Sequence, residues 1–378
     1  MAKCRSGAPL KVCSLASKGN DFGTLFETVM DGFRLVAESV EPIRRFYRIG
    51  KETLELRFAG GALLPVVSPA LDHLAIEKAP ISDLVIHIWD WQSAPKPASI
   101  ILDCLMRSLS WHWTFYLNTR GEINDYNGQG RLAAFHPGPN ILSLLDMPNR
   151  RAVYWAKDAM EVPWHESGSP MRTLLNWWTS HKGYQFVHGG AVGAEGEAFL
   201  IVGKGGTGKS TTCLACLEAG FRYLGDDYSL VNIQEEPWVF SLYNTAKLKG
   251  AEDLSRFPRL RRHLVNAERL NTEKAMMFLN TGYRDQIESG MPLKAILIPK
   301  IRRHTETEIR RAGPAEALAA LAPSTLFQLP GSAQSAMQKM SELVKRVPCY
   351  VLELGANVSG IPEVLKALLL NKNWRNRN

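Results

Sequence analysis

Short apolar runs, separated by turn-forming residues, mark the first 150 residues of the chain as rich in strands. Residues 33–37, 53–58 and 84–89 each place apolar side chains in the short bursts that are typical of strands. Glycine pairs and proline-containing stretches separate these runs, as expected at turns. We therefore predict a strand-rich N-terminal domain over residues 1–180, with substrate recognition as one role open to it.

The pattern changes in the following segment. Residues 170–182 predict a helix, because four large apolar side chains fall close to one face: Leu174, Leu175, Trp177 and Trp178. Residues 183–202 then read as a hairpin that turns at Glu195-Gly196. Its second strand is continuously apolar at 198–202, so we expect that strand to be buried.

A glycine-rich loop follows this buried strand directly. Its sequence, GKGGTGKS, fits the phosphate-binding pattern G-x-x-x-x-G-K-[ST], and a helical stretch at 211–219 comes next. Glycines let the loop turn tightly, so backbone N–H groups and the positive end of the helix converge on phosphate. Lys209 would then reach the β- and γ-phosphates of ATP, and Ser210 would bind Mg²⁺. The predicted nucleotide-binding residues are Gly203, Lys204, Gly205, Gly206, Thr207, Gly208, Lys209, Ser210 and Thr211.

Two adjacent carboxylates follow one helix and one strand after the loop. Gly220 ends the helix, and a short strand at 221–224 leads to Asp226 and Asp227. We expect this strand to return beside the first, which would bring both carboxylates to the phosphate edge of the sheet. There one would hold Mg²⁺ and the other would accept a proton from an attacking hydroxyl. A simple turn is the alternative, because Gly-Asp-Asp is also good turn chemistry.

Three further side chains are candidates for the same site. His188 precedes the buried strand and would bind the metal, contact a phosphate or orient the base, unless its role is structural. Lys247 and Lys249 follow the acidic pair and are candidate contacts to phosphate or substrate. The basic cluster at 256–263 is typical of a solvated surface, and the alternative is a binding surface for an acidic substrate peptide or for the triphosphate.

Composition narrows the partners and the setting. At 378 residues the chain suggests two domains, and its net charge of +8 favours acidic partners such as nucleotides or acidic peptides. The sequence does not show the exposed aromatic residues among basic ones that a stacking surface for nucleic acid needs, and no apolar run could span a membrane. The six cysteines are scattered, which fits a reduced, cytoplasmic setting. Cys213 and Cys216 read as buried packing rather than a redox or metal pair, and a homo-oligomer stays open.

Three elements in this order resemble the catalytic domain of HPr kinase/phosphorylase, and more widely the phosphoenolpyruvate-carboxykinase type of P-loop fold. They are the His188-Gly189 dipeptide, the loop at 203–210 and the LGDD sequence that ends at Asp227. The likeness covers residues 186–233 and implies a P-loop kinase domain of α/β (α+β) class over residues 181–378. It also implies that His188 and the acidic pair are active-site residues. We assign Asp227 as the base and Asp226 as the metal ligand, and the exchanged roles stay open.

Two elements of the HPr kinases are not found. Where that family has a Glu-containing signature, this chain reads TAKLKG at 245–250, and the Arg-containing loop of the reverse reaction is not recognised. Segments at 245–247, 321–328 and 347–350 are more similar to HPr-kinase-related proteins of peptide-tailoring gene clusters. Members tied to lasso-peptide biosynthesis phosphorylate a serine of the precursor peptide.

The resemblance thus implies an ATP- and Mg²⁺-dependent kinase whose partner is a peptide or small protein bearing a serine. Three alternatives remain. They are an HPr-type protein serine kinase, a kinase of free serine, and a nucleotide-gated ATPase that is not a kinase.

Overall fold

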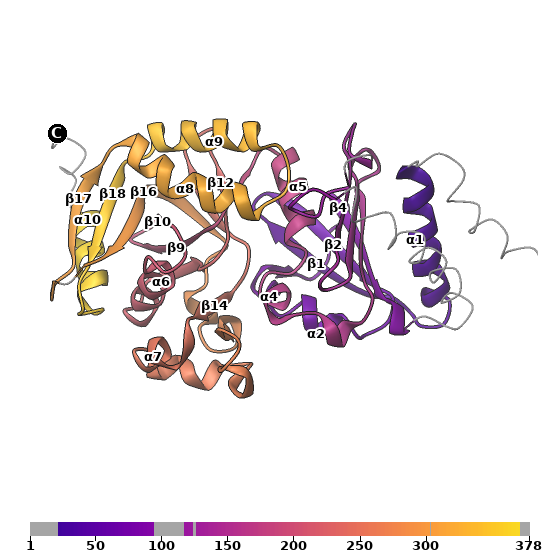
Figure 1. Ribbon diagram of the computed structural model, residues 1–378, viewed down its shortest axis with the longest axis horizontal. Coiled ribbons are helices and arrows are strands. Elements are labelled where there is room, and N and C mark those ends of the chain that lie inside the picture. The colour runs from indigo at the N-terminus through magenta and orange to yellow at the C-terminus, as the bar shows by residue number, and fades with distance from the viewer. Residues whose placement is uncertain (1–21, 94–116, 124–125, 303, 371–378) are drawn as a thin grey trace, which may run out of the picture.

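The computed structural model describes residues 22–93, 117–123, 126–302 and 304–370. They form a mixed α/β structure with several sheets. In Figure 1 the strands of the two larger sheets occupy different ends of the molecule. None of the described helices is both long and apolar enough to cross a membrane.

The first sheet has seven strands in the order β3-β1-β2-β4-β7-β6-β5. The strands predicted at 53–58 and 84–89 are confirmed as β2 and β4. Strands β2 and β4 pair in parallel with each other, whereas most of the remaining strand pairs in this sheet are antiparallel. Its strands are β1 (Ile43–Ile49), β2 (Glu52–Phe58), β3 (Ala75–Ile76), β4 (Leu84–Asp90), β5 (Arg131–His136), β6 (Ile141–Asp146) and β7 (Arg151–Ala156).

The strand predicted at 33–37 is wrong, because these residues end helix α1 (Phe22–Ala37). Buried side chains recur along α1 at spacings of three and four residues, which is the helical period, whereas strand residues would alternate. The five-residue window was too short to contain two turns of this repeat. The helix packs against the sheet through a cluster that includes Trp89 and Trp155. Its buried residues include Phe22, Leu25, Phe26, Val29, Met30, Phe33 and Val36.

The second sheet has nine strands and carries the glycine-rich loop. Seven follow the order β11-β9-β10-β16-β13-β12-β8, and β18 joins β17 to β16. The predicted hairpin is confirmed as β9 and β10, which pair antiparallel. The strands are β8 (Gln185–Val187), β9 (Gly189–Ala194), β10 (Glu197–Val202), β11 (Arg222–Gly225), β12 (Ser229–Asn232), β13 (Trp238–Ser241), β16 (Gly290–Ile301), β17 (Glu308–Ala312) and β18 (Cys349–Leu354).

Helices cover both faces of this sheet. One core cluster joins α6 (Lys209–Glu218) and α10 (Gly360–Leu370) to the strands, and another joins α8 (Pro314–Gln328) and α9 (Ala333–Arg346). Figure 1 shows α8 and α9 on the opposite side of the strands from α6. The helix predicted at 211–219 is confirmed as α6. Two further strands, β14 (Thr245–Leu248) and β15 (Ala275–Phe278), pair separately, next to α7 (Gly250–Ser255).

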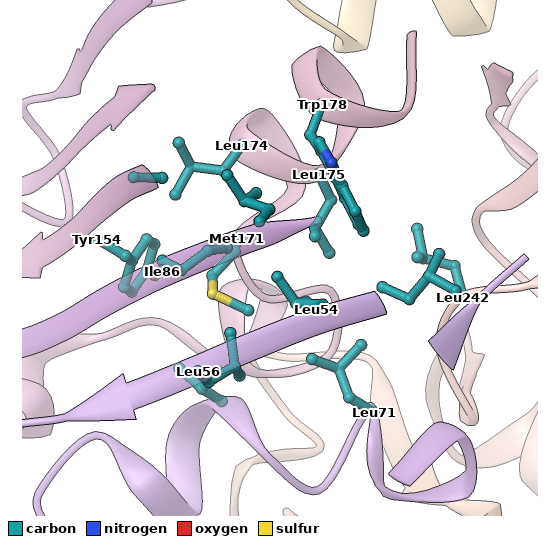
Figure 2. Packing of buried hydrophobic residues seen from close by; sticks show 14 of the residues in the cluster. Leu54, Leu56, Leu71, Ile86, Tyr154, Met171, Leu174, Leu175, Trp178 and Leu242 are labelled. Carbon is teal, nitrogen blue, oxygen red and sulfur yellow. The ribbon is translucent and has the colours of Figure 1, made fainter. Parts of the chain in front are cut away.

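Helix α5 (Arg172–His181), predicted at 170–182, packs between the two larger sheets. A single hydrophobic cluster contains side chains of the first sheet, of α5 and of the second sheet. Figure 2 shows Leu174, Leu175 and Trp178 of α5 beside Leu54 and Ile86 of the first sheet, with Leu242 at the far side of the group. The division at residue 180 stays a prediction, and it falls within this shared cluster.

A buried histidine also joins the two parts of the chain. The His73 ring lies 2.7 Å from the hydroxyl of Ser241 and 3.4 Å from the amide nitrogen of Asn244, and its carbonyl accepts from Arg284. Burial, helped by the Arg284 charge, lowers the pKa of His73 to about 3. The side chain therefore stays neutral in the folded protein at pH values where the unfolded chain binds a proton.

Because the pKa of His73 is lower in the folded protein than in the unfolded chain, we expect the stability of the protein to decrease in acid. The contribution of neutral His73 to stability is present above pH 6.5 and is lost as the pH falls from 6.5 towards 3. Between pH 7 and pH 5 the free energy of unfolding should fall by about 2 kcal/mol through this group. Urea unfolding of the wild type and of His73→Gln at both pH values measures it. The variant should lose less stability than the wild type, and an equal loss would contradict the assignment.

Candidate active site

The glycine-rich loop joins β10 to the first turn of α6. Gly206 and Gly208 have φ angles of 82° and 103°, in the left-handed region where glycine is favoured. Lys204, Gly205 and Gly206 are exposed. The ammonium of Lys209 is buried and donates to the carbonyl oxygens of Gly203 and Lys204, at 2.8 and 3.2 Å. The loop therefore exposes its backbone, while its lysine lies folded back against it.

The acidic pair lies just beyond the end of β11, but β11 is not the direct neighbour of β10. Strand β9 lies between them and is antiparallel to both, so β10 and β11 are parallel to each other. The expectation that the second strand lies beside the first is corrected in this respect. A β-carbon on Gly190 of β9 would lie 2.4 Å from the sulfur of Cys213 and 2.9 Å from the carbonyl oxygen of Asp226. Only glycine at this position therefore lets α6 and the acidic pair approach β9 so closely.

Asp226 is almost completely buried, with an exposed fraction of 2%. Its Oδ2 accepts from the backbone N–H of Lys247 at 2.9 Å, and its Oδ1 has no hydrogen-bond partner of normal geometry among the described residues. Burial and the neighbouring Asp227 charge raise the pKa of Asp226 to about 6, against the opposing effect of the Lys247 N–H and the Ser210 hydroxyl. The Asp226 carboxylate, one oxygen of which has no partner among the described residues, thus lies close to the Ser210 hydroxyl in the first turn of α6.

This oxygen set fits Mg²⁺. Magnesium prefers oxygen ligands and is usually held by one or two protein groups, with phosphate and water completing its shell. Asp226 Oδ1 and the Ser210 hydroxyl are groups of that kind. No three His, Cys, Asp or Glu side chains converge among the described residues. A metal bound here would therefore depend on the nucleotide for further ligands.

Asp227 is held by two partners. Its Oδ1 lies 3.0 Å from Nε2 of His188, and its Oδ2 accepts from Nζ of Lys247 at 2.8 Å. Burial acts to raise the pKa of Asp227, but the Lys247 and His188 interactions outweigh it and hold that pKa well below its usual range. The backbone N–H of His188 in turn donates to the hydroxyl of Thr325 on α8. Asp227 is therefore an ionised carboxylate in a fixed orientation.

The structure also brings in residues that the sequence did not single out. The hydroxyl of Ser169 accepts from Lys247 at 3.1 Å, and Arg172 donates to the Tyr228 hydroxyl at 3.0 Å and to Glu166 at 3.3 Å. Tyr228 directly follows the acidic pair in sequence, so it could have been inferred from that position. The other three precede the acidic pair by more than fifty residues and match no motif, so only the fold reveals them.

Other predicted residues lie elsewhere. Lys249 is exposed and its side chain makes none of the contacts found within the described part of the chain. Strand β14 ends at Leu248, so the alternation that directs Lys247 inward does not continue to Lys249. Arg256, Arg259 and the other arginines of the basic cluster are exposed, as expected for a solvated surface. Cys213, Cys216 and Cys349 are free and buried, and the other three cysteines lie outside the described residues.

Comparison with known proteins gives a distant structural likeness. No protein-family model matches the chain, and no curated protein is similar to it in sequence. Among solved structures, the Hpr(Ser) kinase/phosphatase from Coxiella burnetii aligns with 49% of this chain and 97% of its own, at 8% identity and a TM-score of 0.30. A likeness of this size assigns neither a family nor an activity to the chain.

Proposed function

We propose that this chain is an ATP- and Mg²⁺-dependent kinase that transfers the γ-phosphate to a serine hydroxyl. One observation carries the proposal: the first turn of α6, with Lys209 and Ser210, lies against the two carboxylates that follow β11. A glycine-rich loop alone indicates only phosphate binding. Phosphoryl transfer requires such a loop together with an oriented carboxylate and an oxygen atom that can bind a metal ion, and the Asp226 oxygen that has no partner among the described residues could serve as that ligand.

Each group has a distinct part in the proposed reaction. The exposed loop backbone binds the phosphates, and Lys209 leaves its carbonyl partners to bind phosphate oxygens. Mg²⁺, held by Asp226 and Ser210, would neutralise charge that develops on the phosphates. The acceptor oxygen bonds to the γ-phosphorus while the bond to the bridging oxygen breaks and ADP leaves. Asp227, oriented by His188, takes the proton of the acceptor hydroxyl.

The acceptor we propose is a serine of a precursor peptide of the lasso type. The support is the resemblance of the segments at 245–247, 321–328 and 347–350 to kinases of peptide-tailoring clusters. The structure adds that Lys247 reaches the acidic pair, while Thr325 of the second segment binds the backbone of His188. A protein such as HPr, free serine and water are the competing acceptors.

The test is intact-mass spectrometry after incubation of the chain with ATP, Mg²⁺ and synthetic serine-bearing peptides. We expect one added phosphate per accepted peptide, lost when the serine is replaced by alanine and when the enzyme carries Lys209→Ala. Parallel reactions with HPr and with free L-serine identify the competing acceptors. ADP that accumulates without any phosphorylated acceptor would replace the kinase proposal by the ATPase alternative.

A further inference from the structure

Lys247 has an unusual position between the two parts of the chain. Its backbone N–H binds one carboxylate of the acidic pair and its ammonium binds the other, at 2.9 and 2.8 Å. The same ammonium donates to the hydroxyl of Ser169, and the side chain is only 8% exposed. A lysine ammonium has three N–H donors, and two are used by these partners. The third has no hydrogen-bond acceptor within the part of the chain that the structure describes.

The segment before α5 builds the enclosure for this side chain. A β-carbon at Gly168 would lie 2.8 Å from Cε of Lys247, so the absence of a side chain there lets the lysine pass. The ring of Trp164, in the short helix α4 (Trp164–Ser167), lies 5.9 Å from the ammonium. Ser169 is fully buried, so its hydroxyl offers a fixed acceptor. The N-terminal half of the chain thus determines where the Lys247 charge lies.

We propose that Lys247 binds the phosphoryl group during its transfer, and that Ser169 is the residue that positions Lys247 for this. The inference rests on the proposed function and adds a task for the N-terminal half. The phosphoryl group would lie between the first turn of α6 and the acceptor oxygen beside Asp227, because both flank the acidic pair. The free N–H of Lys247 is then a cationic donor that the fold holds directly beside Asp227.

The role is electrostatic and involves no proton transfer from the lysine. The bond between the γ-phosphorus and the bridging oxygen breaks as the acceptor oxygen bonds to phosphorus, and the acceptor proton passes to Asp227. Lys247 stays protonated and stabilises the negative charge on the equatorial oxygens of the transferring group. Because this charge is present in the transition state, loss of the ammonium should lower kcat much more than it weakens ATP binding.

The experiment compares Lys247→Met, Lys247→Arg, Ser169→Ala and the double variant in full-length protein. We expect Lys247→Met to lower kcat by about 100-fold or more, with the dissociation constant of ATP changed less than about threefold. Lys247→Arg should recover part of the loss. Ser169→Ala should lower kcat by about tenfold alone and have no further effect in the Lys247→Met background, because it acts through the lysine.

Two matched variants control for packing. Ser167→Ala removes a hydroxyl two residues away that makes no side-chain hydrogen bond among the described residues, and should leave kcat unchanged. Lys339→Met removes another lysine that binds across the chain, to the carbonyl oxygens of Ser180 and Tyr184, and should lower the melting temperature without affecting kcat.

The outcomes separate this inference from the proposed function. If wild-type protein phosphorylates a peptide and folded Lys247→Met does so equally fast, the inference is wrong and the kinase proposal stands. If Ser169→Ala lowers kcat by the same factor with and without Lys247, Ser169 does not act through the lysine and that assignment is wrong. If the wild type only hydrolyses ATP, the serine-kinase proposal is wrong. The rates of ADP release by the same variants then test the role of Lys247. A wild type that consumes no ATP overturns both.

Discussion

Replacement of Asp227 by asparagine is expected to lower kcat for phosphate transfer by roughly 10²–10⁴-fold while ATP binding stays close to that of the wild type. Asparagine keeps the shape of the side chain but cannot take a proton from the acceptor hydroxyl. It also removes the negative charge that pairs with Lys247 at 2.8 Å. Neither change touches the glycine-rich loop, so the nucleotide should bind as before.

The measurement has two parts. Initial rates of peptide phosphorylation give kcat, and titration with a fluorescent ATP analogue in the absence of acceptor gives the nucleotide affinity. Asp158→Asn is a suitable control, because within the part of the chain that the structure describes the Asp158 side chain accepts only the N–H of Met160, at the start of a short helical turn, and asparagine can do the same. Rates within a few-fold of the wild type for folded Asp227→Asn would show that another group takes the proton.

His188 should behave differently from Asp227. Its ring contacts Oδ1 of Asp227 and lies 5.3 Å from the ring of Tyr228. Since it orients the carboxylate rather than accepting the proton, we class it as a positioning residue in the proposed reaction. Its loss should therefore cost less than the loss of the carboxylate itself.

The sequence predicted the placement of the glycine-rich loop and the acidic pair because its signals are local. Strand β10, the glycine loop and α6 follow one another without interruption, and each has its own pattern of apolar residues or glycines. The acidic pair could be placed because it follows the next strand of the chain. The positions of these residues are determined by segments that are adjacent in the sequence. Periodicity and motif spacing describe such segments well.

The remaining features depend on tertiary contacts that leave no local pattern. Strand β9 lies between β10 and β11, which spacing along the chain does not reveal. Ser169 and Lys247 are 78 residues apart in the sequence, and a single serine forms no periodic pattern that could reveal their contact. Helix α1 was missed for another reason, since its repeat is clear only over the whole of Phe22–Ala37.

The surroundings of the two carboxylates support the proposed division of roles. Asp226 has its pKa raised to about 6 by burial and by its neighbour, and one of its oxygens has no hydrogen-bond partner among the described residues. Asp227 has both oxygens engaged by cationic or hydrogen-bonding side chains. A metal ion would replace the missing partner of the first carboxylate and relieve the cost of its burial. The second is already oriented by its partners, and because its pKa is lowered it is the weaker base of the two, so its proposed part depends on its position rather than on its basicity.

That division leads to the second large expected effect, on the metal dependence of Asp226→Asn. The variant should need at least about tenfold more Mg²⁺ for half-maximal activity, because removal of a direct ligand should cost no less than removal of an outer-shell partner, which costs roughly 10- to 100-fold. Its thermal stability should be unchanged or higher, since asparagine can still accept the Lys247 N–H and no longer places a charge in a buried site. Rates measured against Mg²⁺ concentration after removal of metal with EDTA, together with melting temperatures, test both statements. An unchanged Mg²⁺ requirement would place the metal elsewhere, and a lower melting temperature would show that the carboxylate serves packing instead.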